Sequence, residues 1–112
     1  AVLLAQRVKR PGDVPADEAV STLHDAWAAP AFAAALKAFD RYEFTAGNEL
    51  DGAAVSVGWG DADRLLPYGR QAPRARAALP HARHVTLDGG HLPFTDCPDA
   101  VATLIRGTAA RA

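Results

Sequence analysis

The chain has 112 residues, which is enough for one domain with a modest core. Hydrophobic residues make up 49% of it and charged residues 22%, proportions that exclude a disordered chain. Twelve Lys and Arg against thirteen Asp and Glu leave a net charge of -1, so the charge balance gives no basis for binding nucleic acid or an anionic membrane surface.

The single cysteine, Cys97, excludes an intrachain disulfide. The early apolar run at residues 1–5 is too short for a signal-peptide core or a membrane span, and we expect a soluble, cytoplasmic protein. Alanine supplies 26 residues and arginine outnumbers lysine ten to two, a bias typical of a GC-rich bacterial genome.

The first half of the chain is predicted to be mainly helical. Residues 7–13 form a basic stretch closed by turn residues, and residues 14–46 are predicted to form an alanine-rich helical hairpin. Gly47 and Asn48 provide its expected end. Apolar residues recur at helical spacing in both arms: Val20, Leu23 and Trp27 in the first, and Phe32, Leu36 and Phe39 in the second.

The second half predicts strand, helix, strand and helix, an α/β arrangement. The strands are expected at residues 55–59 and 84–87 and the helices at 69–79 and 97–106. Pro73 fits only the first turn of its helix. In the last helix we expect Asp96 as the cap, Pro98 in the first turn, and a buried face of Val101, Leu104 and Ile105.

Asp63 and His91 are the candidate site. A strand–helix–strand crossover makes its two strands parallel, and both residues lie four positions beyond a strand, after Trp59 and Leu87. Both therefore leave the carboxyl edge of the sheet, where open α/β sheets place their ligands. We expect a carboxylate oxygen of Asp63 within roughly 2.6–3.2 Å of a ring nitrogen of His91. Such a pair is the acid–base half of a nucleophilic hydrolase.

Two motifs carry a family resemblance. Residues 59–67, WGDADRLLP, resemble the W-G-x-x-D-x-x-x-P segment that carries the catalytic acid in the α/β-hydrolase superfamily. Residues 90–93, GHLP, resemble the G-H-x-P segment that carries its catalytic histidine. The resemblance covers residues 50–106 and implies that Asp63 is the triad acid and His91 the general base. We expect no cofactor and no metal.

Several points remain open within that resemblance. Asp61 is the alternative acid. The stretch from Leu87 to His91 is one residue shorter than the family's L-P-G-x-G-H, which either draws His91 out of reach or shifts the end of the strand. By this interpretation residues 1–49 are a helical cap-like segment and residues 50–112 are the C-terminal βαβα part of the hydrolase core.

The family's nucleophile is missing. It sits on a G-x-S-x-G turn, and the only serines here, Ser21 and Ser56, do not have that context. We therefore expect a fragment of a hydrolase that acts on a small ester-like molecule, inactive by itself and associating with copies of itself or with the missing N-terminal half. The alternative is a non-catalytic α/β module that self-associates.

Other residues are weaker candidates. His24 either faces a substrate from the cap or lies on the surface, and the surface position is favoured. The spacing of His81, His84, Asp88 and His91 fits no known metal site. Arg70, Arg74 and Arg76 are expected to form a solvated face. Trp27, Phe32 and Phe39 either pack in a core or cap or line a substrate pocket, and packing is favoured. Cys97 has no partner spaced to activate it.

Overall fold

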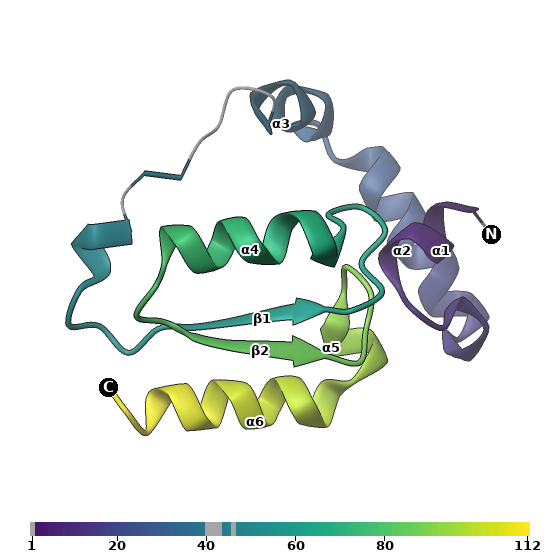
Figure 1. Ribbon diagram of the computed structural model, residues 1–112. Coiled ribbons are helices and arrows are strands. Elements are labelled where there is room, and N and C mark those ends of the chain that lie inside the picture. Colours follow the sequence, from purple (N-terminus) through teal and green to yellow (C-terminus); the bar gives the residue numbers. More distant parts are fainter. Residues whose placement is uncertain (1, 40–43, 46) are drawn as a thin grey trace.

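The computed structural model describes residues 2–39, 44–45 and 47–112, which form a mixed α/β fold (Figure 1). Its sheet has two parallel strands, β1 (Ser56–Gly60) and β2 (Arg83–Leu87). Ser56 pairs with Arg83 and Gly60 with Leu87, so the strands start and end at the same height. The predicted strands are confirmed to within one residue at each end.

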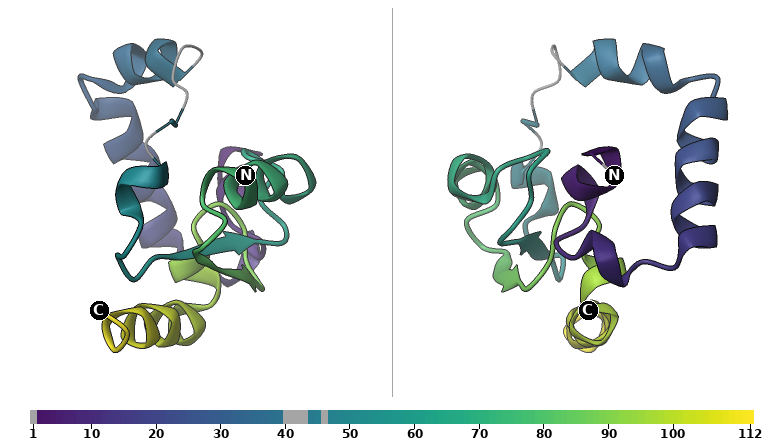
Figure 2. Two further views of the ribbon diagram at one scale, coloured as in Figure 1. Left: turned by 60° about the vertical axis from the view of Figure 1, so that its left-hand side comes forward. Right: turned by 90° about the vertical axis from the view of Figure 1, so that its right-hand side faces the viewer.

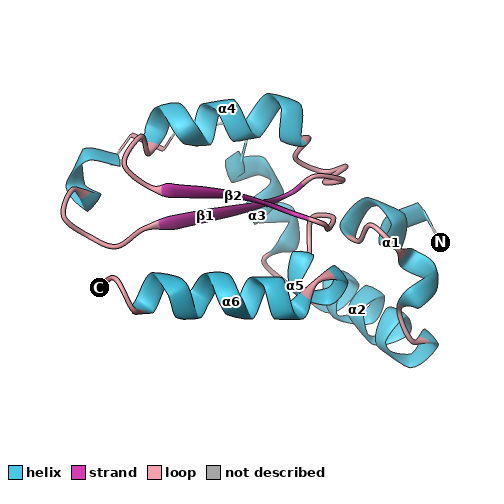
Figure 3. Cartoon of the chain, turned by 60° about the horizontal axis from the view of Figure 1, so that its bottom comes forward, coloured by secondary structure: helices cyan, strands magenta, loops and turns pink. Residues whose placement is uncertain are grey.

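Helices cover both faces of the sheet. The crossover helix α4 (Tyr68–Ala78) lies on one face, and α6 (Pro98–Ala109) lies on the other (Figures 1 and 3). A short helix, α5 (Pro93–Asp96), links β2 to α6. Parallel strands need both faces covered, and this order of strand, helix, strand and helix supplies the cover. The predicted α/β fold class and the predicted order of these elements are therefore confirmed.

The crossover helix differs from expectation at one position. Because α4 begins at Tyr68, Pro73 lies in its interior rather than in its first turn. The proline ring removes the N–H that would bond to the carbonyl of Gly69. The helix still packs well, since Ala72 is buried against the sheet and its arginines are exposed as predicted.

The last helix corrects two expectations. Pro98 occupies its first turn as predicted, but Asp96 does not cap it: the residue before the helix is Cys97, which makes no side-chain capping bond. Ile105 is 63% exposed rather than buried, whereas Val101 and Leu104 are half-buried. A two-stranded sheet is only about 5 Å wide between its strand axes, so it covers a narrow stripe of the helix.

The N-terminal residues form structure that the sequence did not predict. Helix α1 (Val2–Arg7) is followed by a 3-10 helix (Pro11–Asp13). Leu4 and Val8 lie one helical turn apart and are 8% and 2% exposed, among the most buried apolar residues of the described chain. They pack near the loops at the carboxyl edge of the sheet, and Leu92 donates its backbone N–H to the carbonyl of Arg7 at 2.8 Å.

The predicted hairpin contains α2 (Ala16–Ala28) and α3 (Phe32–Phe39), while residues 40–43 and 46 lie outside the described part. Helix α3 is described as Phe32–Phe39, and Gly47 and Asn48, the expected stop, belong to a 3-10 helix (Gly47–Leu50). No helix in the described residues is long and apolar enough to cross a membrane.

Helices α2 and α3 stand apart from the sheet and its covering helices (right-hand view of Figure 2). Val20 is 67% exposed, Trp27 87% and Phe32 46%, so the expected packing of Trp27 and Phe32 is wrong; the side chain of Phe39 lies outside the description. The accessible surface is 7880 Å², against roughly 5,900 Å² for a compact monomer of this mass. Few elements contact the described part of the hairpin, so the side chains of Val20, Trp27 and Phe32 are left in solvent.

Candidate functional site

The loops that follow the two strands continue their pairing. Asp61 donates its backbone N–H to the carbonyl of Leu87 at 2.9 Å, and Ala62 donates to Gly89 at 3.0 Å. The loops therefore leave the sheet side by side at its carboxyl edge. This pairing determines which side chains of the two loops can meet.

The Asp63 carboxylate is held from its own loop. Its Oδ1 accepts the backbone N–H groups of Leu65 at 2.9 Å and Leu66 at 2.8 Å. The indole N–H of Trp59 donates to the carbonyl of Leu66 at 3.0 Å, which ties the loop back to β1. Only 5% of the Asp63 side chain is exposed. Oδ1 is thereby occupied, and Oδ2 points to another partner.

That partner is His91. Its Nδ1 lies 3.0 Å from Oδ2 of Asp63, so the predicted contact is confirmed and the shorter glycine loop does not draw the ring out of reach. An ionised carboxylate only accepts hydrogen bonds, so Nδ1 carries the proton and Nε2 of the neutral ring is an acceptor. The side chain is 33% exposed, and no group in the described residues bonds to Nε2. This arrangement can accept a proton at Nε2.

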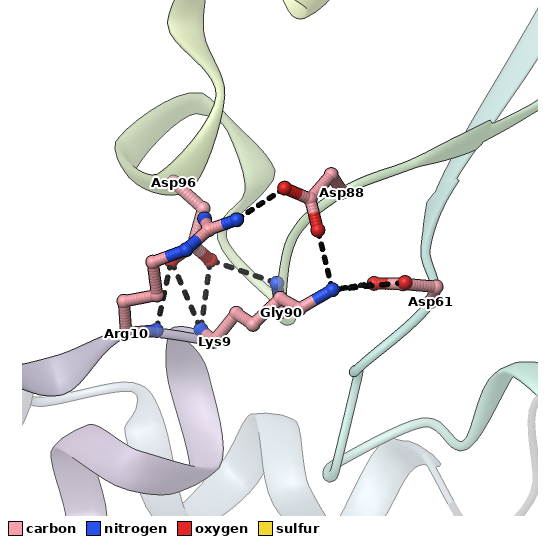
Figure 4. A network of polar contacts seen from close by, with 6 residues as sticks. All are labelled: Lys9, Arg10, Asp61, Asp88, Gly90 and Asp96. Atoms are coloured by element: carbon pink, nitrogen blue, oxygen red, sulfur yellow. Dashed lines mark hydrogen bonds and ion pairs between the residues drawn. The ribbon is translucent and has the colours of Figure 1, made fainter.

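Asp61, the alternative acid, has a different partner. Both its carboxylate oxygens lie 2.9 Å from Nζ of Lys9, and its side chain is 43% exposed. Lys9 also binds Asp88, which Arg10 binds in turn (Figure 4). Hydrogen bonds from Lys9 and Arg10 lower the pKa of Asp88. These pairs are solvent-exposed, where water and salt screen the attraction between the charges.

Asp96 makes a more enclosed set of contacts, which the sequence analysis missed. Its Oδ2 accepts backbone N–H groups from Gly90 at 2.7 Å and Lys9 at 2.8 Å, and its Oδ1 accepts from Arg10 at 3.1 Å and from the same N–H of Lys9 at 3.0 Å (Figure 4). Partial burial alone would raise the pKa of Asp96, but these backbone donors outweigh it and lower the pKa. The stabilisation is therefore present above the ordinary carboxyl pKa and is lost as pH falls through the lowered one.

The two serines lie away from this edge. Ser56 is the first residue of β1, and its hydroxyl accepts a bond from Arg111 at 2.8 Å. The length of the strand puts it about 13 Å from the end that leads to Asp63. Ser21 is exposed on α2. Within the described residues, neither serine makes a hydrogen bond to His91.

The remaining candidate residues have contacts or an exposure that do not indicate a functional site. The side chain of His24 is exposed, which agrees with the surface position that the sequence favoured. His84 lies with its Nε2 2.8 Å from the carbonyl of Leu79, and across the described residues no three potential metal ligands gather. Burial, together with nearby carboxylates, raises the pKa of the Cys97 thiol, which disfavours the reactive thiolate.

A pocket of about 370 Å³ lies between the start of α2 and α5. Phe94 and Asp96 line it, but Asp63 and His91 do not. It therefore offers no binding cavity for a molecule that reacts at Nε2.

Comparison with known proteins gives no relative. No family model, no curated protein and no solved structure matches this chain.

Proposed function

We propose that Asp63 and His91 are the acid and the general base of a nucleophile–His–Asp hydrolase, and that this chain is the C-terminal part of an α/β-hydrolase core. The observation that carries the proposal is the 3.0 Å contact in which the nearly buried Asp63 carboxylate accepts from Nδ1 of a ring that is 33% exposed, with no described residue bonded to its Nε2. The W-G-x-x-D and G-H-x-P motifs around the two residues support it.

The chemistry assigned to the pair is proton transfer. Nε2 of His91 takes the hydroxyl proton of the nucleophile as its oxygen attacks the acyl carbon of a small ester. Asp63 keeps the ring in the Nδ1–H tautomer and stabilises the imidazolium that forms. The same proton then passes from Nε2 to the leaving alkoxide as the ester C–O bond breaks. Water repeats the cycle to release the acid.

The proposal assigns the nucleophile to a segment other than residues 1–112. Ser56 lies at the opposite end of β1 and donors for an oxyanion hole normally come with the nucleophile turn. We thus expect this chain alone to release nitrophenol from p-nitrophenyl acetate without a burst, at no more than the rate of an accessible imidazole. Stopped-flow absorbance measures the burst and the steady rate of nitrophenol release. His91→Ala should lower this slow rate, and Ser21→Ala and Ser56→Ala should leave it unchanged.

The decisive comparison adds the coding sequence upstream of residue 1. A G-x-S-x-G turn there, and a burst that His91→Ala removes, would support the proposal. An upstream sequence without a nucleophile would contradict it. So would a burst from the 112-residue chain that Ser21→Ala or Ser56→Ala abolishes.

A second candidate function, self-association without catalysis, has its own observations. No strand in the described residues pairs with β1 on the side away from β2. The N–H of Arg83 donates to the carbonyl of Val55, and the N–H of Asp61 donates to the carbonyl of Leu87. These bonds show that the odd-numbered residues of β1 direct their backbone polar groups toward β2. Trp59 directs its N–H toward β2, and Gly58 directs its N–H toward the open edge. The open edge of β1 is one surface to which a second copy can bind, and the exposed Trp27 on α2 is another.

Sedimentation and hydrogen exchange test self-association together. We expect a dimer or larger assembly at micromolar concentration. If copies join through the edge, the amide of Gly58 becomes as protected as that of Trp59 when the protein concentration rises. If they join through α2, Trp27→Lys dissociates them while the Gly58 amide stays fast. A monomer with a cooperative melt would contradict this candidate.

A further inference from the structure

We propose that Asp96 is a positioning residue for His91: its carboxylate gathers the backbone N–H groups of Gly90, Lys9 and Arg10 and so fixes the loop that carries the imidazole. The consequence for catalysis rests on the proposed function. The effect on the hydrogen bonding of the His91 ring is independent of that function.

The first support is the position of the bond. Gly90 immediately precedes His91, and its N–H lies 2.7 Å from Oδ2 of Asp96. Gly90 is buried, and a Cβ atom on it would lie 2.7 Å from the carbonyl carbon of Val8. The backbone on one side of the ring is thus held between the N-terminal segment and the Asp96 carboxylate.

The second support is that the same carboxylate joins two segments far apart in the chain. Residues 9 and 10 lie 87 and 86 positions from Asp96. On the other side of His91, Leu92 donates to the carbonyl of Arg7 at 2.8 Å. The N-terminal segment therefore binds the His91 loop both before and after the imidazole, and Asp96 supplies one of the two attachments.

The neighbouring ion pairs are weaker candidates for this role. Lys9 and Arg10 bind Asp88 through flexible side chains, and the Asp88 side chain is 62% exposed. Exposed pairs of this kind are screened by solvent. Asp96 instead binds backbone groups, whose displacement moves the loop itself. Asp88 is for this reason the matched control.

The test is NMR of the full chain below its melting temperature, with far-UV circular dichroism as the check on folding. The readout is the Nδ1 proton of His91, which the bond to Asp63 should hold downfield and in slow exchange with water. Asp96→Ala should shift this resonance and accelerate its exchange by about tenfold or more. Asp88→Ala should leave both unchanged. Asp96→Asn should keep part of the signal, because its carbonyl oxygen can still accept from Gly90 and Lys9 while its NH₂ group faces the N–H of Arg10 and loses that bond.

Two results would overturn the inference. One is a folded Asp96→Ala protein in which the His91 resonance and its exchange match the unsubstituted chain, since Asp96 would then only stabilise the fold. The other, which remains decisive if the alanine variant does not fold, is an unchanged resonance in Asp96→Glu, where the extra methylene must displace the Gly90 backbone. A positive outcome together with a completed protein that lacks His91-dependent hydrolysis would reject the proposed function alone.

Discussion

Replacing Asp63 by asparagine should move the ring proton of His91 from Nδ1 to Nε2. The backbone N–H groups of Leu65 and Leu66 both point at Oδ1, so the carbonyl oxygen of the asparagine has to take that position. Its NH₂ group then occupies the position of Oδ2, which faces Nδ1 of His91. A donor there requires an acceptor opposite, and the ring must adopt the Nε2–H tautomer.

The chemical consequence is large because Nε2 is the nitrogen that takes the proton of the nucleophile in the proposed mechanism. A protonated Nε2 on a neutral ring cannot take a proton from a nucleophile. In the protein completed with its nucleophile segment, we expect Asp63→Asn to lower kcat about 10⁴-fold, the size of effect known when a triad histidine is held in the wrong tautomer. Steady-state ester hydrolysis measures the loss.

The tautomer itself can be measured on the 112-residue chain. Nitrogen-15 chemical shifts of the His91 ring distinguish the Nδ1–H form from the Nε2–H form. Asp61→Asn is the matched control, since it makes the same change two residues away at a carboxylate bound to Lys9. Asp61→Asn should leave the ring in the Nδ1–H form. A ring that keeps this form in Asp63→Asn, or changes it in Asp61→Asn, would contradict the assignment of the acid.

The sequence was sufficient to predict the Asp63–His91 contact because that contact follows from local rules. A strand–helix–strand crossover makes the strands parallel, and equal offsets beyond them bring the two residues to one height. The same reasoning could not choose between Asp61 and Asp63. That choice depends on Lys9, which binds Asp61 across 52 positions of sequence, and no periodicity connects the two.

The errors about which apolar side chains are buried have a common physical cause. Periodicity identifies an apolar stripe but does not say whether anything lies against it. The stripe at Val20 and Trp27 is present in α2, yet it is exposed because few elements contact that helix. Conversely, Leu4 and Val8 were too short a pattern to predict a helix, and they are buried at the edge of the site. The spacing of these two residues by one helical turn was the available signal.

Gly60 makes possible the close approach of the two loops, and its replacement by alanine should be the most destabilising small substitution near the site. An added Cβ would lie 2.8 Å from the carbonyl carbon of Gly89 and closer still to the carbonyl oxygens of Gly89 and Gly90. All three are backbone atoms, so no side chain can rotate away. The loops must separate, which strains the bonds from Asp61 to Leu87 and from Ala62 to Gly89.

We expect Gly60→Ala to lower the free energy of unfolding by about 3 kcal/mol or more, and Tm by roughly 10–20 °C. Gly69→Ala is the control, because nothing lies within 4 Å of its added Cβ near the start of α4, and it should be neutral or stabilise by about 0.5–1 kcal/mol. Thermal unfolding followed by circular dichroism compares the two. Because separating the loops also pulls His91 from Asp63, the Nδ1 proton signal should be lost in the folded Gly60→Ala protein and kept in Gly69→Ala. Equal stabilities for the two variants would mean that the loops do not approach each other as closely as these contacts require.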